Sequence, residues 1–241
     1  MPVPRFLLLS ALLAWGLIAV TSASARAQAG DDDPMARRLA ACTACHGPQG
    51  IELEDGYVPR IHGKPAGYLY NQLINYQDYR RRNTSMNHMV AHLSPAYLYE
   101  IADYFAGLDT PYPEPAAAPA TAVAERGEQL VRHGDTRADI PACAACHGER
   151  LTGVQPNTPG LIGLPRQYIM AQLGAWRVGT RHAAAPDCMH TIVGRMGPGD
   201  IEAVAAWLAS RPIPTDTHPV ANAVLDPPLD CGSVPVPERR P

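Results

Sequence analysis

The 241-residue sequence lacks an excess of charge of either sign. It has 20 Lys and Arg against 23 Asp and Glu, a formal net charge of −3, and only 18% of its residues are charged. A nucleic-acid-binding protein needs clustered cationic charge to face the phosphates, so this composition argues against that class. Aromatic residues are scarce as well, at 6%. With 46% hydrophobic residues, however, the chain is too apolar to be disordered.

The chain also lacks a hydrophobic run long enough to span a membrane. The longest apolar run covers residues 6–20, follows Arg5, and precedes Ala23-Ser24-Ala25, which fits an A-x-A cleavage site. A run of about 15 residues is shorter than the roughly 20 that a transmembrane helix needs, and the arrangement is typical of a secretory signal peptide. We therefore predict a signal peptide over residues 1–25 and export to the periplasm. An uncleaved N-terminal anchor is the alternative.

One sequence unit occurs twice. Cys42-Thr43-Ala44-Cys45-His46 recurs as Cys143-Ala144-Ala145-Cys146-His147, an offset of 101. The segment 59–65 matches 159–165, and further matches follow at offsets of 100 to 103. Two tandem copies of one small domain explain this pattern. The predicted boundaries are domain 1 at 26–108, a Pro- and Ala-rich linker at 109–121, domain 2 at 122–210 and a Pro-rich, extended surface tail at 211–241.

Each copy is predicted to be all-α, because apolar residues recur with helical spacing and no convincing strand alternation is present. Ser94 followed by Pro95 is a helix start signal. The expected helices are 34–45, 65–80 and 94–108 in the first copy, and 122–133, 165–178 and 198–210 in the second. Units of this size have a thin core and commonly need an additional stabilising group, which a covalently bound apolar cofactor would supply.

The CxxCH motif carries the chemistry. Two cysteines three positions apart present both sulfurs to one edge of a planar macrocycle, and the adjacent histidine can turn its imidazole to the iron, so the motif is typical of c-type haem attachment. A thioredoxin-like redox pair would not explain the histidine in both copies, and a zinc site would not require it next to the cysteine. The sequence therefore predicts two haem c groups, attached through Cys42, Cys45, Cys143 and Cys146, with His46 and His147 as iron ligands.

The chain resembles the dihaem class I cytochromes c of the cytochrome c4 type. It shares with them a signal peptide, two CxxCH domains, a Pro-rich linker and a methionine before each last helix, over about residues 34–210. The resemblance implies two small helical domains, each built around a covalent haem with a histidine and a distal methionine as axial ligands. Met86 stands seven residues before Leu93 of Leu93-Ser94, and Met189 stands seven before Met196. On this family spacing, Met86 and Met189 are the expected distal ligands.

Other distal ligands are left open by the sequence. Met89 competes with Met86 in the first copy. Histidine ligation is a further alternative, and it would lower the potential relative to His/Met. The histidines close to the two methionines are His88, His92, His182 and His190.

The resemblance also assigns supporting residues. A ligating imidazole normally donates its other N–H to a fixed acceptor, and in the family this is a proline carbonyl, which maps onto Pro59 and Pro159. Gly127 matches a glycine that lets the first helix of such a domain pack closely on the last, and the first copy lacks it. The run Arg80-Arg81-Arg82 could offset haem propionates or guide a partner, although a solvated loop is the simpler interpretation.

Cys188 and Cys231 are left once four cysteines are assigned to haem. In an oxidising compartment a disulfide between them is the preferred interpretation, and it would pin the tail over the distal loop of the second haem. The alternative is that Cys188 binds the iron in place of Met189, as a thiolate does in dihaem sulfur-oxidising proteins of this general build. The chain would then be a thiosulfate-type oxidoreductase.

Six-coordinate His/Met iron leaves no position for a substrate, so the predicted function is outer-sphere electron transfer without catalysis. The resemblance implies a carrier between a quinol-oxidising complex or a dehydrogenase and a terminal oxidase. Peripheral association with a membrane is left open. The alternatives are a dihaem oxidoreductase, thiosulfate-type or peroxidase-like, with one labile or Cys-ligated haem, and a cytochrome subunit of a periplasmic dehydrogenase.

Overall fold

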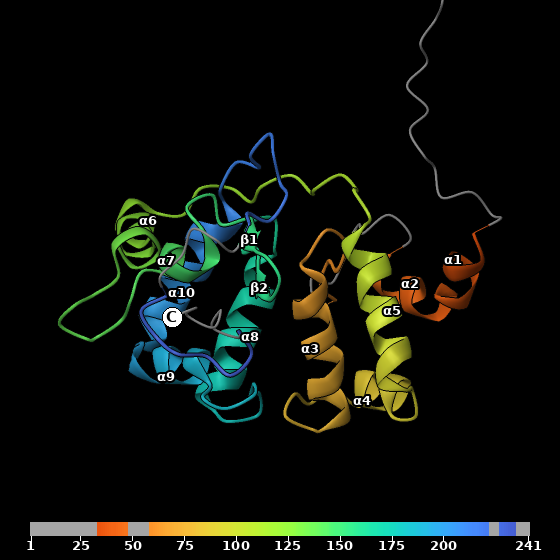
Figure 1. Cartoon of the computed structure of the whole chain (residues 1–241). Helices are drawn as coiled ribbons and strands as arrows, with labels where there is room; N and C mark the ends of the chain where they lie inside the picture. Colours follow the sequence, from red (N-terminus) through yellow and green to blue (C-terminus); the bar gives the residue numbers. More distant parts are fainter. Residues whose placement is uncertain (1–32, 48–57, 222–226, 235–241) are drawn as a thin grey trace, which may run out of the picture.

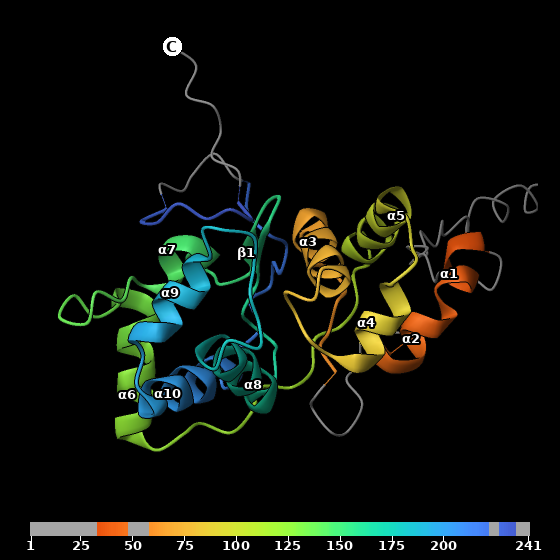
Figure 2. The ribbon, with the colours of Figure 1, turned by 90° about the horizontal axis from the view of Figure 1, so that it is seen from below.

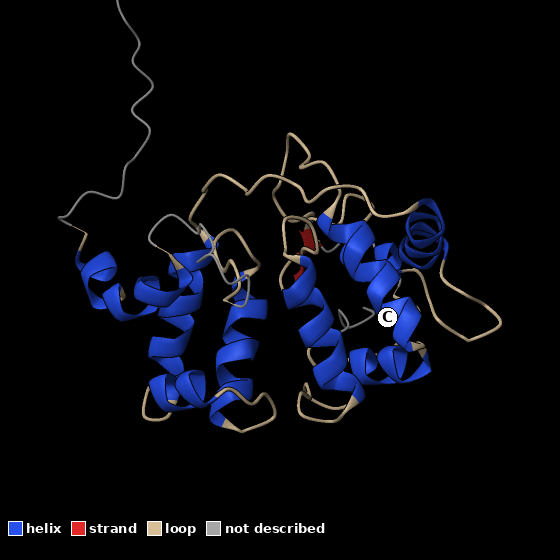
Figure 3. Cartoon of the chain, turned by 180° about the vertical axis from the view of Figure 1, so that it is seen from behind, coloured by secondary structure: helices blue, strands red, loops and turns tan. Residues whose placement is uncertain are grey.

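The chain forms two helical lobes joined by an arched linker (Figure 1). A computed structural model describes residues 33–47, 58–221 and 227–234, so the predicted signal peptide lies outside the described residues. Helices dominate both lobes, and the predicted all-α class is confirmed (Figure 3). Within the described ranges, no helix is long and apolar enough to cross a membrane.

The first lobe packs two long helices around a small apolar core. Helix α3 lies against α5, and the core includes Leu69, Leu98 and Phe105. Ser94 caps α5 as predicted, because its hydroxyl accepts a hydrogen bond from the Tyr97 N–H at 3.3 Å. The helices of this lobe are α1 (Pro34–Arg38), α2 (Ala40–His46), α3 (Ala66–Gln77), α4 (Thr84–Val90) and α5 (Pro95–Ala106). The helix expected over 34–45 is thus divided in two at Leu39.

The second lobe repeats this arrangement with a larger core. Helix α10 packs against both α6 and α8, and Trp207 and Leu208 on α10 are almost fully buried. The elements are α6 (Thr121–Glu128), the π-helical turn η1 (Gln129–His133), α7 (Cys143–His147), β1 (Gly153–Val154), β2 (Thr158–Pro159), α8 (Arg166–Arg177), α9 (Cys188–Arg195) and α10 (Pro198–Ala209). The short antiparallel pairing of β1 with β2 was not expected from the sequence.

Gly127 allows α6 to approach α10 closely. A Cβ atom at this position would lie 2.4 Å from the carbonyl oxygen of Ala203 and 2.5 Å from Cβ of Trp207. Only a residue without a side chain fits this crossing. In the first lobe, by contrast, α1 and α2 approach α5 at few points, in keeping with the missing glycine.

The linker and the tail both tie the lobes together. The guanidinium of Arg60 donates hydrogen bonds to the carbonyls of Thr110 and Pro111 and lies 4.1 Å from the ring centroid of Tyr112. The tail, predicted to be extended on the surface, pairs at Val220 with Val154 of the second lobe. Further along, the carbonyl of Ser233 accepts a hydrogen bond from Asn71 of the first lobe at 3.1 Å.

Substituting Gly127→Ala is expected to destabilise the second lobe by about 1–3 kcal/mol, because the added methyl group overpacks the α6–α10 crossing. Gly174→Ala in α8 is the matched control, since a Cβ there meets no atom within 4 Å. That change should be neutral or stabilise by up to about 1 kcal/mol through helix propensity. Urea unfolding of both variants checks this, and equal effects of the two changes would contradict the packing argument.

Candidate haem sites

Each lobe contains an apolar cavity with a CxxCH motif in its wall. The first cavity has a volume of about 500 Å³ and the second about 200 Å³. The structure brings the residues predicted for each site into the lining of the same cavity. They are Cys42, Cys45, His46, Pro59 and Met86 in the first, and Cys143, Cys146, His147, Pro159 and Met189 in the second.

None of the four motif cysteines forms a disulfide bond, and three of them have a raised thiol pKa. Burial raises the pKa of Cys143 to about 12, and it also raises the pKa of Cys42 and of Cys146. A CxxC redox pair works through a thiolate with a lowered pKa. The environment of these thiols therefore disfavours a thioredoxin-like role and is compatible with thioether attachment.

Both motif histidines are held by the same hydrogen bond. Nδ1 of His46 lies 2.9 Å from the carbonyl oxygen of Pro59, and Nδ1 of His147 lies 2.7 Å from that of Pro159. Because a carbonyl can only accept, Nδ1 carries the proton and Nε2 keeps its lone pair for a metal. Burial lowers the pKa of both histidines, which favours the neutral imidazole that binds iron.

The two candidate methionines lie in the first turns of short helices that were not among the helices expected from the sequence. The side chain of Asn83 accepts a hydrogen bond from the Met86 N–H at 3.1 Å and starts α4. In the second lobe the side chain of Asp187 accepts a hydrogen bond from the His190 N–H at 3.1 Å and starts α9, the helix that carries Met189. These side-chain caps fix the backbone from which each methionine projects.

The alternative ligands have less favourable positions. Met89 also lines the first cavity but is 42% exposed, whereas Met86 packs against the core of the lobe. The four nearby histidines are exposed, and none belongs to a cavity wall. His182 and His190 are instead hydrogen-bonded to the backbone of α8 and the turn after it.

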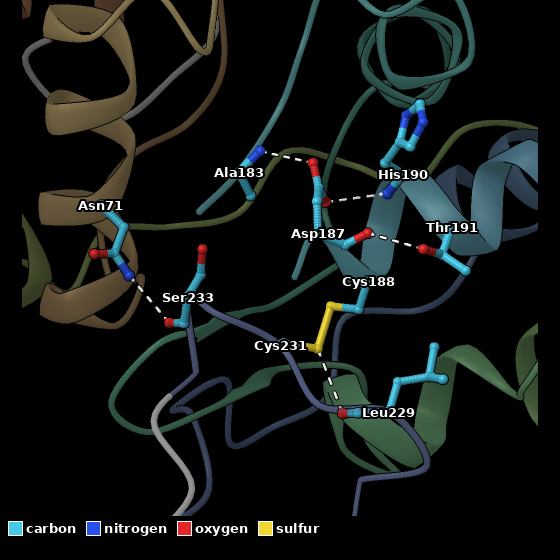
Figure 4. The surroundings of a disulfide bond; sticks show 9 residues. All are labelled: Asn71, Ala183, Asp187, Cys188, His190, Thr191, Leu229, Cys231 and Ser233. Atoms are coloured by element: carbon cyan, nitrogen blue, oxygen red, sulfur yellow. Dashed lines mark hydrogen bonds between the residues drawn. A yellow bond between two sulfur atoms is a disulfide. The ribbon is translucent and has the colours of Figure 1, made fainter. Parts of the chain in front are cut away.

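Cys188 and Cys231 form a disulfide (Figure 4) with an S–S distance of 2.21 Å. The bond joins the first residue of α9 to the tail, and Cys231 and Leu229 line the second cavity. Cys188 is thereby engaged in a covalent bond next to Met189. In this state it offers no free thiolate to an iron.

Two arginines meet where the lobes face each other, and both are hydrogen-bonded to glutamines of α3 and α8. In the first lobe, α3 is the helix nearest to the second lobe (Figure 2). Arg81 donates to Oε1 of Gln72 at 3.0 Å and of Gln172 at 2.7 Å. Arg181 donates to the same two oxygens, at 3.0 and 2.7 Å. Arg81 is only 7% exposed, so the interpretation of this residue as part of a solvated loop was wrong. Its guanidinium is buried because the other lobe covers it, which no local pattern reveals.

These arginines lack acidic partners. Within the described residues, neither Arg81 nor Arg181 forms an ion pair with an Asp or Glu. Burial, together with the charge of Arg81, lowers the pKa of Arg181. Burial also disfavours the charged form of Arg81, but interactions with the hydroxyls of nearby tyrosines outweigh it and raise the pKa of Arg81. Buried like charges are costly unless an anion compensates them. Both line the first cavity and Arg181 also lines the second, so two apolar cavities with a shared cationic end fit two apolar macrocycles that carry carboxylates.

Comparisons with known proteins agree with this geometry. A cytochrome c family model matches residues 124–212. Cytochrome c4 of Pseudomonas aeruginosa is 31% identical over 84% of this chain and 96% of its own length. The chain belongs to the dihaem, cytochrome c4-like class I cytochromes c. It is accordingly an electron carrier with covalently bound haem c.

Other similar proteins extend the comparison. The thiosulfate dehydrogenase electron acceptor of Thiomonas intermedia is 40% identical, over 72% of this chain and 80% of its own. The structure of reduced cytochrome c4 from Pseudomonas stutzeri is 28% identical with a TM-score of 0.63, covering 75% of this chain and 98% of that one. Thiosulfate dehydrogenase (TsdBA) from Marichromatium purpuratum is 31% identical with a TM-score of 0.64, and the match covers 71% of this chain but 36% of that longer one.

Replacing Met86 should remove the distal ligand of the haem iron in the first lobe, whereas replacing Met89 should leave that ligand in place. In Met86→Ala the optical band characteristic of methionine bound to ferric haem is expected to fall by about half, since the second haem keeps its ligand. Met89→Ala is the matched control and should retain the full band. A loss of the band in Met89→Ala but not in Met86→Ala would reverse the ligand assignment.

Proposed function

We propose that this chain is a periplasmic carrier that accepts electrons from a thiosulfate dehydrogenase and passes them to a terminal oxidase. In this proposal the haems are attached through Cys42 and Cys45 and through Cys143 and Cys146. The iron ligands are His46 with Met86, and His147 with Met189.

The observation that carries the proposal is that each cavity wall contains both a histidine and a methionine. The haem supplies a one-electron couple, and a methionine ligand raises its potential. In each lobe a proline carbonyl orients the imidazole of the motif histidine. A helix with a side-chain cap at its start carries the methionine whose sulfur would bind the iron. Apolar side chains around the site exclude water. If a histidine and a methionine held each iron in this way, no position would be left for a substrate.

The choice of donor is supported by sequence similarity. Two relatives, from Thiomonas intermedia at 40% identity and from Stutzerimonas stutzeri at 35%, are named thiosulfate dehydrogenase electron acceptors. Joining two thiosulfate ions into tetrathionate releases two electrons, and a chain with two one-electron haems can take up both.

The rival proposal is that the chain itself oxidises thiosulfate at a Cys-ligated haem. The disulfide of Cys188 counts against it, because Cys188 is the remaining cysteine closest to a candidate distal ligand. The same disulfide supports export, since such bonds persist in oxidising compartments. The sequence pattern of residues 1–25 supports export independently.

The two proposals are separated by mixing the oxidised protein with thiosulfate and following haem absorbance. Thiosulfate alone should leave both haems oxidised, and a catalytic amount of thiosulfate dehydrogenase should then reduce both, with two electrons taken up per chain. The enzyme without thiosulfate is the control. Reduction by thiosulfate alone would support the oxidoreductase, and no reduction even with the enzyme would show that the donor is a different one.

A further inference from the structure

The two copies differ in charge at one position of the lobe interface. Lys64 is the only lysine of the chain, and at an offset of 100 its counterpart is Leu164. Leu164 is 8% exposed and belongs to the core of its own lobe. Lys64 instead reaches out of the first lobe, and its ammonium group donates to the carbonyl of Gly160 in the second at 3.4 Å.

Gly160 lies next to the residue that orients the second histidine. The preceding carbonyl, that of Pro159, accepts the hydrogen bond from Nδ1 of His147. Lys64 also lines the second cavity together with His147 and Pro159, so its side chain lies beside this site. No equivalent cation reaches from the second lobe at this position, because Leu164 carries no charge.

The ammonium group has no acidic partner of its own. Within the described residues, no ion pair includes Lys64. Burial lowers its pKa to about 8, which leaves it mostly protonated at neutral pH. Lys64 is half-buried and lines both cavities, and a cation in such a place is stabilised by a neighbouring anion.

We propose that Lys64 of the first lobe is a positioning residue for the haem of the second lobe, where it holds the Pro159–Gly160 segment and pairs with a haem carboxylate. A fixed positive charge near a haem stabilises the reduced form, because reduction adds an electron. Lys64 therefore raises the potential of the second haem more than that of the first. This contribution adds to that of Arg60, Arg81 and Arg82, which line the first cavity but not the second. The inference rests on the haem sites and not on which enzyme donates the electrons.

The test is a potentiometric titration of Lys64→Met, followed by NMR so that each haem is resolved. The equilibrium constant for electron transfer from the first to the second haem is expected to fall by about tenfold, which is 59 mV for a one-electron couple. Lys64→Arg should restore it. Arg166→Gln is the control for removing one positive charge, because Arg166 is exposed, pairs with Glu202 and lines neither cavity.

Lys64→Gln separates the effect of the Lys64 charge from that of its hydrogen bond to Gly160. It also replaces Lys64→Met in the test if that variant does not fold. Glutamine can still donate to the Gly160 carbonyl but carries no charge, so the proposal predicts the same shift as in Lys64→Met. Unchanged potentials in Lys64→Gln would reduce Lys64 to a structural tether and overturn the electrostatic role. Equal shifts at both haems, or a larger shift at the first haem, would also overturn the proposal.

Discussion

Each lobe folds around an apolar cavity, and the need to fill that cavity with an apolar group is the constraint on which the rest of the structure depends. Cavity walls that touch nothing lose their packing contacts, and a domain of this size has few contacts to spare. The long helices therefore have two roles, since they form the hydrophobic core of each lobe and also line its cavity. They are α3 and α5 in the first lobe, and α8 and α10 in the second. The helices α2 and α7 place the CxxCH motifs in the cavity walls, and α4 and α9 place there the methionines that we propose as ligands.

The second constraint acts between the lobes, where the cationic ends of the two cavities meet. The crossed hydrogen bonds of Arg81 and Arg181 with Gln72 and Gln172 follow the pseudo-symmetry of the repeat. Because these side chains line the cavities, the same contacts set the relative position of the lobes and the polar end of the cavities. Lys64 breaks the symmetry of this arrangement.

The sequence predicted those features that depend on local spacing. The CxxCH motifs, the tandem repeat and the three main helices of each copy follow from short motifs and periodicity. The helices α4 and α9 were not among the expected helices because seven or eight residues carry little periodic signal, although the capping residues Asn83 and Asp187 stand in front of them. The burial of Arg81 and the reach of Lys64 could not be predicted, because they result from contacts with a lobe about 100 residues away in the chain. Gln72 and Gln172 did match in the repeat, and that match was the available sign of an interface.

The central claim is that both irons are closed by protein side chains, which makes the chain a carrier. It is tested most directly by the optical spectrum of the fully reduced protein before and after carbon monoxide is added, with the haem content per chain measured on the same sample. The account predicts two haems per chain and no spectral change, because the proposed histidine and methionine ligands would leave no free position on either iron. A carbon monoxide adduct at either haem would show an open or weakly held position and would contradict the claim.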